Sequence, residues 1–154
     1  MKKILIAVDD TKSTREIFNK CTHVCKCLAP EELLLLYVEK FEGRSLVDAM
    51  LGDAELSTLK EVLEGTEYQE ALDEKANTIL NYYKKALEGN APVPNVKGIV
   101  KTGHPAEEIL NTAQENDVDM IMIGSKGKRG AKWLMGSVSR EVVNTAECPV
   151  LVVK

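Results

Sequence analysis

The chain has no long hydrophobic run and few aromatic residues. Its first apolar run, Ile4 to Val8, holds five residues before Asp9, too few for the core of a signal peptide or for a membrane span. Aromatic residues make up 5% of the 154 residues, hydrophobic residues 44% and charged residues 29%, which is typical of globular proteins rather than fibrous, disordered or membrane chains. We therefore expect residues 1–154 to form one cytoplasmic domain without a membrane partner.

Cysteine is also scarce. The chain has four, Cys21, Cys25, Cys27 and Cys148, and in a reducing cytoplasm they should remain free thiols. Cys21 and Cys25 would share one face of a helix, with His23 nearby, which leaves a metal or redox site open. Their spacing matches no zinc pattern, however, and cysteine is among the most often buried residue types, so the pattern favours plain packing.

An excess of positive charge is absent too. The chain has 20 basic and 24 acidic residues, a formal net charge of −4. Sequence-independent binding to nucleic acid depends on protein cations that neutralise phosphates, so we expect no nucleic-acid partner.

Apolar segments predict five strands, and they alternate with helical patterns. The expected strands are Lys3 to Val8, Leu33 to Val38, Val96 to Val100, Met120 to Ile123 and Pro149 to Val153. Continuous apolar runs are typical of strands that are covered on both faces, as in parallel sheets. The expected helices are Ser13 to Leu28, Glu67 to Leu87, Ala106 to Ala113 and Ser137 to Ala146. This order predicts an α/β doubly wound, five-stranded parallel sheet with helices on both faces.

Local signals predict where the helices begin and end. Ser13 and Glu16 have the form of a capping box, which places the first helix start at Ser13. Gly89 is placed to cap the long helix at its carboxyl end. Pro105 suits a first helical turn, so His104 is expected to be a turn residue rather than a catalytic base.

Two further patterns lead to expectations about packing and movement. Val138, Val142 and Val143 should face inward from the last helix. Residues 41 to 65 hold short helical pieces broken by glycines, which are either a lid over a site or a surface insert without consequence.

One stretch, Ile121 to Ser139, has a composition that indicates a ligand. After the strand ends at Gly124 it contains four glycines, three serines and four cations with no acid among them, namely Gly124, Gly127, Gly130, Gly136, Ser125, Ser137, Ser139, Lys126, Lys128, Arg129 and Lys132. Glycines let backbone N–H groups approach an anion, and a helix that starts near Ser137 points its positive end at the same place. The stretch therefore favours a phosphate ligand, although a solvated turn has a similar composition.

This stretch matches neither the P-loop nor the dinucleotide-binding fingerprint. Instead, Gly124-Ser-Lys-Gly127 followed by Gly136-Ser137 resembles the universal stress protein family, whose ATP-binding branch has Gly, two residues, Gly, nine residues, then Gly-Ser or Gly-Thr. The second gap here, Lys128 to Met135, holds eight residues and is one short of that pattern. The first strand with Asp9, the segment Val100 to Leu110 and Cys148 to Val153 also resemble the family.

The resemblance implies a strand order of 3-2-1-4-5 and a nucleotide site. It implies that Ala7, Asp9 and Val38 surround the adenosine, with Asp9 near the ribose or a metal. In the loop it implies contacts from Ile123, Gly124, Lys126 and Gly127, and at the phosphates from Gly136, Ser137 and Val138, while Arg129 is a further loop cation. Asp9 is equally suited to a turn or helix cap, and Val38 to the core.

The expected function is therefore that of a cytoplasmic protein that binds ATP, or AMP or ADP, with Mg²⁺ or Mn²⁺ bridging the phosphates, and that acts as a nucleotide-responsive stress or signalling module. We identify no catalytic residue and no specific protein ligand for the metal. The alternatives are a nucleotide-free member that acts through protein contacts, favoured by the shortened gap, and a slow ATP hydrolase. The expected edge strand, Pro149 to Val153, is blunted only by Pro149 at its start, which leaves four residues able to pair and predicts a homodimer.

Overall fold

The computed structural model describes residues 2–39, 67–90, 93–125 and 135–154. The strands are β1 (Lys3–Val8), β2 (Glu32–Glu39), β3 (Asn95–Thr102), β4 (Met120–Gly124) and β5 (Val150–Val153). The helices are α1 (Lys12–Leu28), α4 (Glu67–Asn90), α5 (Pro105–Glu115) and α6 (Ser137–Thr145). The segment from 41 to 65, and with it the question of a lid, lies outside the described residues.

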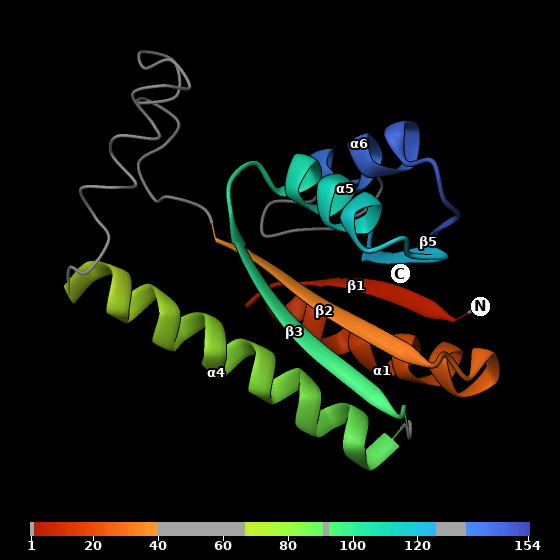
Figure 1. Ribbon diagram of the computed structural model, residues 1–154, viewed down its shortest axis with the longest axis horizontal. Coiled ribbons are helices and arrows are strands. Elements are labelled where there is room, and N and C mark those ends of the chain that lie inside the picture. The colour runs from red at the N-terminus through yellow and green to blue at the C-terminus, as the bar shows by residue number, and fades with distance from the viewer. Residues whose placement is uncertain (1, 40–66, 91–92, 126–134) are drawn as a thin grey trace.

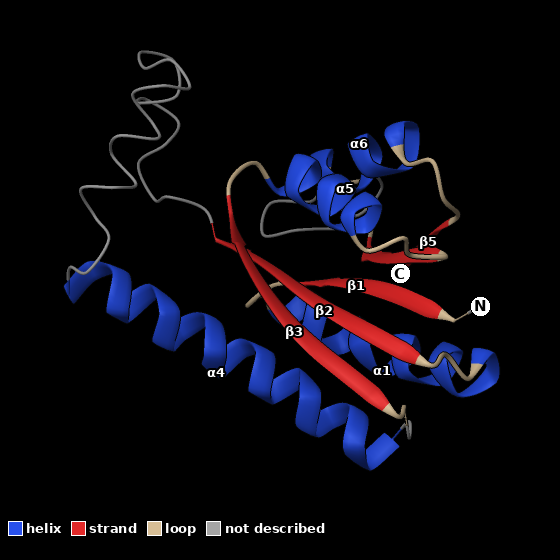
Figure 2. Ribbon diagram, in the orientation of Figure 1, coloured by secondary structure: helices blue, strands red, loops and turns tan. Residues whose placement is uncertain are grey.

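The five strands form one parallel sheet in the order β3-β2-β1-β4-β5, as predicted (Figure 1). Helices α1 and α4 cover one face, and α5 and α6 cover the other (Figure 2). The chain runs outward from β1 to β2 and β3, then returns to β4 on the other side of β1. In open α/β sheets, ligands bind outside the carboxyl ends of the strands at this reversal.

The central strand is buried on both faces, which explains why its sequence is apolar without alternation. Ile4 and Ile6 pack in the core beneath α1 and α4, whereas Leu5 packs in the core beneath α5 and α6. Their side chains are at most 2% exposed. Full burial of such a side chain contributes about 1.5–3 kcal/mol to stability. These buried side chains therefore hold β1 in the middle of the sheet, and the candidate site lies at its carboxyl end.

Two predicted helix ends are wrong. α1 begins at Lys12, and its cap is Thr11, whose extended backbone lets the side-chain oxygen accept a hydrogen bond from the N–H of Thr14. The capping box at Ser13 therefore does not start the helix. α4 continues through Gly89 to Asn90, so Gly89 is a helical residue rather than a cap.

The inward face of α6 is narrower than predicted. Val142 is fully buried and Val138 packs partly against the core, but Val143 is 41% exposed. Successive residues of a helix are separated by about 100° around its axis. Because Val142 faces the sheet from the nine-residue helix α6, Val143 is turned away from it. Among the described residues, no helix is long and apolar enough to cross a membrane.

The buried cysteines belong to the core. Cys21 and Cys25 lie on the face of α1 that packs against the sheet, and both are free thiols. Burial raises the pKa of Cys21 to about 12 and that of Cys25 to about 11, which keeps both thiols protonated at neutral pH. Their role in this structure is apolar packing.

Candidate functional site

The candidate site lies where β1, β2 and β4 end, along the edge of the sheet that the carboxyl ends of its strands form. β1 pairs in parallel with β2 on one side and with β4 on the other, so the three carboxyl ends are adjacent. Ala7 and Val38 are partly buried near the ends of β1 and β2, and Ile123 and Gly124 end β4. Ala7, Val38 and Ile123 pack on the α5–α6 side of the sheet. The structure therefore brings four of the predicted nucleotide contacts to one edge.

Asp9 forms the turn that connects β1 to α1. Its Oδ1 atom accepts two hydrogen bonds from Thr11, one from the backbone N–H at 2.8 Å and one from the hydroxyl at 2.6 Å. This is an Asx turn, the structural role that the sequence also allowed. Oδ1 therefore holds the turn, and the second carboxylate oxygen accepts no hydrogen bond from the part of the chain that the structure describes.

Tyr83 holds this turn from the opposite side and was missed as a site residue. Its hydroxyl donates a hydrogen bond to the backbone carbonyl of Asp9 at 2.8 Å, and its ring packs on Phe18 with centroids 4.5 Å apart. Burial, followed by the negative charge of Asp9, raises the pKa of the phenol, which therefore stays a donor. The helical spacing of α4 predicted a core tyrosine, but it carried no signal for this contact.

Ser125 and Gly136 join the two ends of the glycine-rich loop. The N–H of Gly136 donates to the carbonyl oxygen of Ser125 at 2.8 Å, and the N–H of Ser125 donates to the carbonyl oxygen of Val153 at 2.9 Å. Ser125 is buried. The loop therefore leaves β4 and returns to α6 at almost the same point, beside the end of β5.

The amino-terminal end of α6 is directed by this contact toward the same edge. Gly136 is its N-cap, and Ser137 and Val138 are its first helical residues. The N–H groups in the first turn of a helix have no acceptor within the helix and carry partial positive charge, so they suit a phosphate oxygen. Gly136 has φ −61° and ψ 154°, which any residue can adopt, so a glycine here is not required by backbone strain.

The remaining predicted contacts lie in the loop itself. Lys126, Gly127 and Arg129 fall outside the described residues. Their predicted roles at the phosphates stay predictions.

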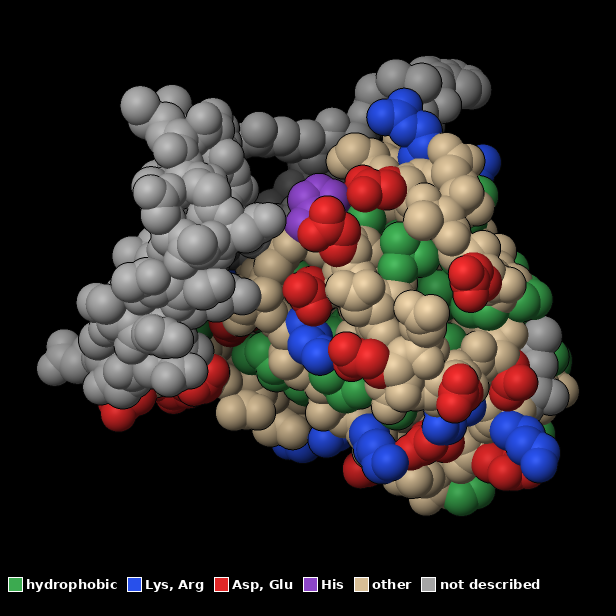
Figure 3. Space-filling model, turned by 45° about the horizontal axis from the view of Figure 1, so that its top comes forward, with side chains coloured by type: hydrophobic (Ala, Val, Ile, Leu, Met, Phe, Trp, Pro, Cys, Tyr) green, Lys and Arg blue, Asp and Glu red, His purple; other side chains and the backbone are tan. Residues whose placement is uncertain are grey.

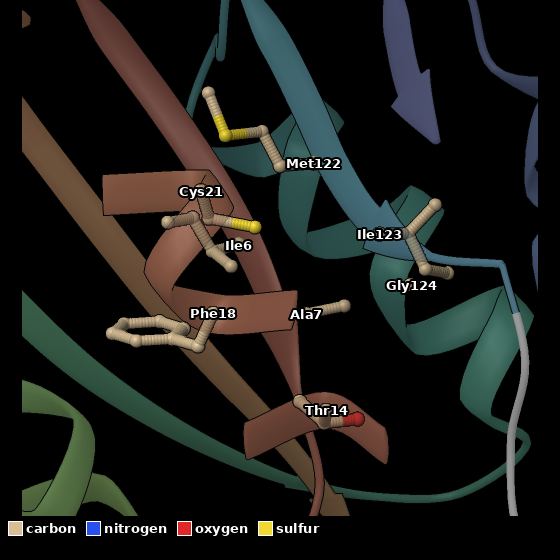
Figure 4. Close-up of a pocket in the computed structure, with 8 residues that line it drawn as sticks. All are labelled: Ile6, Ala7, Thr14, Phe18, Cys21, Met122, Ile123 and Gly124. Atoms are coloured by element: carbon tan, nitrogen blue, oxygen red, sulfur yellow. The ribbon is translucent and has the colours of Figure 1, made fainter. Parts of the chain in front are cut away.

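The core is closely packed directly beneath this edge. Figure 4 shows a small hollow between α1, β1 and β4, lined by side chains that include Ile6, Phe18 and Met122. The hollow is too narrow to admit a water molecule. A ligand at this edge would therefore rest across the strand ends rather than enter the core.

His104 lies on the same edge but has a turn role. It is the N-cap of α5 and makes no side-chain capping hydrogen bond. Its Nδ1 atom is 3.9 Å from Oε1 of Glu141 in α6, and both side chains are about half exposed. A contact of this length on the surface contributes little to stability, and it does not by itself form an acid–base pair.

A divalent ion would depend mainly on the nucleotide for its ligands. Within the described ranges, no three His, Cys, Asp or Glu side chains converge so that they could hold a metal ion. Mg²⁺ usually binds through one or two carboxylates together with phosphates and water, and the second oxygen of Asp9 is suited to that role. The residues present thus fit a metal that arrives with phosphate.

Comparisons with known proteins give consistent matches over the whole chain. The sequence model of the Universal stress protein family matches residues 1–154. Universal stress protein MJ0577 of Methanocaldococcus jannaschii is 38% identical, with 99% of this chain and 94% of its own length covered. Universal stress protein YxiE of Bacillus subtilis is 33% identical, with 99% and 98% covered. The solved structure of MJ0577 has a TM-score of 0.74 and 31% identity over 99% of this chain and 95% of that chain.

Two more distant solved structures contain a nucleotide. The universal stress protein from Archaeoglobus fulgidus in complex with dAMP has a TM-score of 0.60 and 17% identity, covering 100% of this chain and 98% of that one. A family protein from Arabidopsis thaliana with AMP bound has a TM-score of 0.62 and 18% identity, covering 100% and 92%. At these identities they share the fold of this chain.

Proposed function

This chain belongs to the universal stress protein family, and we propose that it is a nucleotide-binding member that takes ATP across the ends of β1, β2 and β4. The adenosine would lie near Ala7, Asp9 and Val38, and the phosphates near Gly124 and the start of α6. Relatives of the same fold bind AMP and dAMP, which supports an adenine nucleotide as the ligand. In the cell the protein would act as a nucleotide-responsive module of the cytoplasm.

The hydrogen bond between Gly136 and Ser125 carries this proposal. It joins the start of α6, with its free N–H groups, to the residue that directly follows β4. The shortened gap from Lys128 to Met135 then changes the length of a loop whose ends are already joined. The loop therefore lacks one residue of the pattern while the end of β4 and the start of α6, which we propose bind the phosphates, stay joined.

A divalent ion, Mg²⁺ or Mn²⁺, would be held between the phosphates and the second carboxylate oxygen of Asp9. The ion would supply positive charge where the phosphates crowd together. Thr11 would fix the orientation of the Asp9 carboxylate through the two hydrogen bonds to its other oxygen.

A nucleotide-free function through protein contacts is the second candidate. The one specific observation in its favour is the eight-residue gap, because the loop between Gly127 and Gly136 lacks one residue of the ATP-binding pattern. A phosphate-release assay would test the further alternative, slow ATP hydrolysis.

Calorimetric titration of ATP into valine variants tests the proposal. Gly136→Val should abolish measurable ATP binding because the branched side chain blocks approach of phosphate to the backbone, and the φ and ψ angles of Gly136 accept valine. Gly127→Val should have the same effect. Ala71→Val, which adds methyl groups on the exposed face of α4, is the matched control and should bind like the parent. Unchanged ATP affinity in folded Gly136→Val and Gly127→Val proteins would show that ATP does not bind at the proposed site.

The loop cations give a separate test of the phosphate site. Removal of Lys126 or Arg129 should weaken ATP more than adenosine, since a cation acts on phosphate charge. Equal losses for the two ligands would show that the basic loop does not contact phosphate.

We also propose that the protein is a homodimer joined through β5. β5 is an edge strand of the sheet. The carbonyl of Pro149 accepts a hydrogen bond from Ile121 in β4, and that of Val153 accepts one from Ser125, which directly follows β4. Val150 and Val152, which alternate with them, therefore present their N–H and C=O groups to the open edge. A two-fold copy of the strand would pair with those groups in an antiparallel ladder.

A further inference from the structure

A groove runs along α5, between this helix and the segment that connects α6 to β5, from the first turn of α5 to the amino end of the sheet. Its volume is about 560 Å³. Asp117 and Val118, which precede β4, and Cys148, which precedes β5, line one end of it. Because parallel strands share their direction, this is the amino end of the sheet. The groove therefore shares no residue with the strand ends that would hold a nucleotide.

The floor of the groove is apolar and its margin is acidic. Leu110 and Ala146 supply partly exposed apolar surface, and Val118 and Ile121 lie buried beneath it. Figure 3 shows the α5 and α6 side of the molecule, where acidic side chains and some basic ones lie among apolar and uncharged surface. The groove lining includes three acidic residues, all exposed, and no lysine or arginine among the described residues; the acids are Glu107, Asp117 and Glu147.

The three carboxylates are not neutralised locally. None of them has an ion-pair partner in the part of the chain that the structure describes, whereas the neighbouring Glu115 pairs with Lys101 at 3.2 Å. Three unpaired negative charges around apolar surface repel nucleic acid and anionic lipid, and they attract a positively charged apolar partner.

The shape of the groove favours an elongated occupant. Its lining follows α5 from Glu107 to Gln114, about 10 Å along the helix axis at 1.5 Å per residue, and continues to Asp117 and Val118 beyond the helix. A helix of roughly two turns has the length of the α5 part, and amphipathic helices bind in apolar grooves through residues spaced three or four apart. The exposed amides of Asn111 and Gln114 add hydrogen-bonding groups along the same side.

We propose that this groove docks a short basic amphipathic helix of a partner protein. Apolar side chains of that helix would cover Leu110 and Ala146, and its lysines or arginines would pair with Glu107, Asp117 and Glu147. The groove would give the protein a partner site that is physically separate from the nucleotide edge.

Fluorescence anisotropy with a labelled 15-residue peptide, leucine on one helical face and lysine on the other, tests the charge requirement. The probe should bind the full chain, and a peptide of scrambled order with the same composition should bind about tenfold more weakly. The triple variant Glu107→Lys, Asp117→Lys, Glu147→Lys should also lose at least about tenfold in affinity. The matched control reverses three exposed acids of α4, Glu70→Lys, Glu74→Lys and Glu88→Lys, and should change affinity by less than about twofold.

The native thiols report on the place of binding. Cys148 lines the groove, while Cys27 is exposed on α1. The bound peptide should slow alkylation of Cys148, followed by mass spectrometry, and leave that of Cys27 unchanged. ATP should not affect either result, so failure of the nucleotide proposal would leave this one standing. Equal affinity for the ordered and scrambled peptides, equal losses in the two triple variants, or no protection of Cys148 would overturn the proposal.

Discussion

Replacing Asp9 by asparagine separates its structural role from its proposed role with the nucleotide. Asparagine keeps an oxygen that can accept from the N–H and hydroxyl of Thr11, at present 2.8 and 2.6 Å from Oδ1. It loses the negative charge, and an NH2 group replaces the second carboxylate oxygen. Because charge-assisted hydrogen bonds are about twice as strong as neutral ones, we expect Asp9→Asn to lower the free energy of unfolding by roughly 1 kcal/mol.

The effect on Mg²⁺–ATP should be larger. Loss of one contact with a charged group costs about 1.5–3 kcal/mol of binding free energy, which corresponds to a roughly ten- to hundredfold larger dissociation constant. Without Mg²⁺ the same substitution should weaken ATP little, or strengthen it, since the carboxylate repels the phosphates when no cation lies between them.

The assay is calorimetric titration of ATP with Mg²⁺ and with EDTA, together with urea unfolding. Asp10→Asn is the matched control, because this neighbouring carboxylate pairs with Lys75 on α4 at 3.5 Å and should not affect ATP. Equal Mg²⁺–ATP affinity in Asp9→Asn and the parent would show that Asp9 only holds the turn and does not contact the bound metal. A loss of equal size with EDTA would refute the metal contact.

Three further substitutions test packing, pH dependence and assembly. A Cβ atom at Gly98 would lie 3.0 Å from Leu80 Cδ1, so Gly98→Val should lower the free energy of unfolding by about 1–3 kcal/mol, measured in urea. Burial and the charge of Asp73 raise the pKa of Glu39, so the contribution of Glu39 to stability should be complete below the ordinary pKa of 4.5 and be lost as pH rises through the native value. Glu39→Gln should remove this pH dependence from the urea unfolding profile, and an unchanged slope would contradict it. Val152→Pro removes an edge N–H, so light scattering should find monomers, whereas Val152→Thr should remain dimeric.

The strands could be predicted from the sequence because their buried positions hold apolar residues one after another. In β1 every position from Ile4 to Ile6 is apolar, and the structure buries all three on alternating faces. The family resemblance then supplied the strand order, which places Asp9 and Gly124 at one edge. The predictions of the strands and of their order were therefore confirmed, whereas the site residues predicted from the glycine motif stay predictions.

Helix ends and site contacts were harder to predict, for two physical reasons. Thr11 and Ser13 are both good cap residues, and the choice between them follows from the Asp9 turn, in which Oδ1 holds Thr11. The hydrogen bond from Tyr83 to Asp9 spans 74 positions, and the bond between Gly136 and Ser125 joins backbone groups. Backbone groups occur in every residue type, so no sequence pattern marks them.

Amide chemical shifts during an ATP titration test the central claim most directly. The account predicts that ATP with Mg²⁺ shifts the backbone amides at the carboxyl ends of the strands and the start of α6, above all those of Gly124, Ser125, Ser137 and Val138. Amides at the opposite end of the sheet, such as that of Val118, should stay unchanged. Shifts confined to that opposite end, or no shifts at millimolar ATP, would contradict nucleotide binding at this edge.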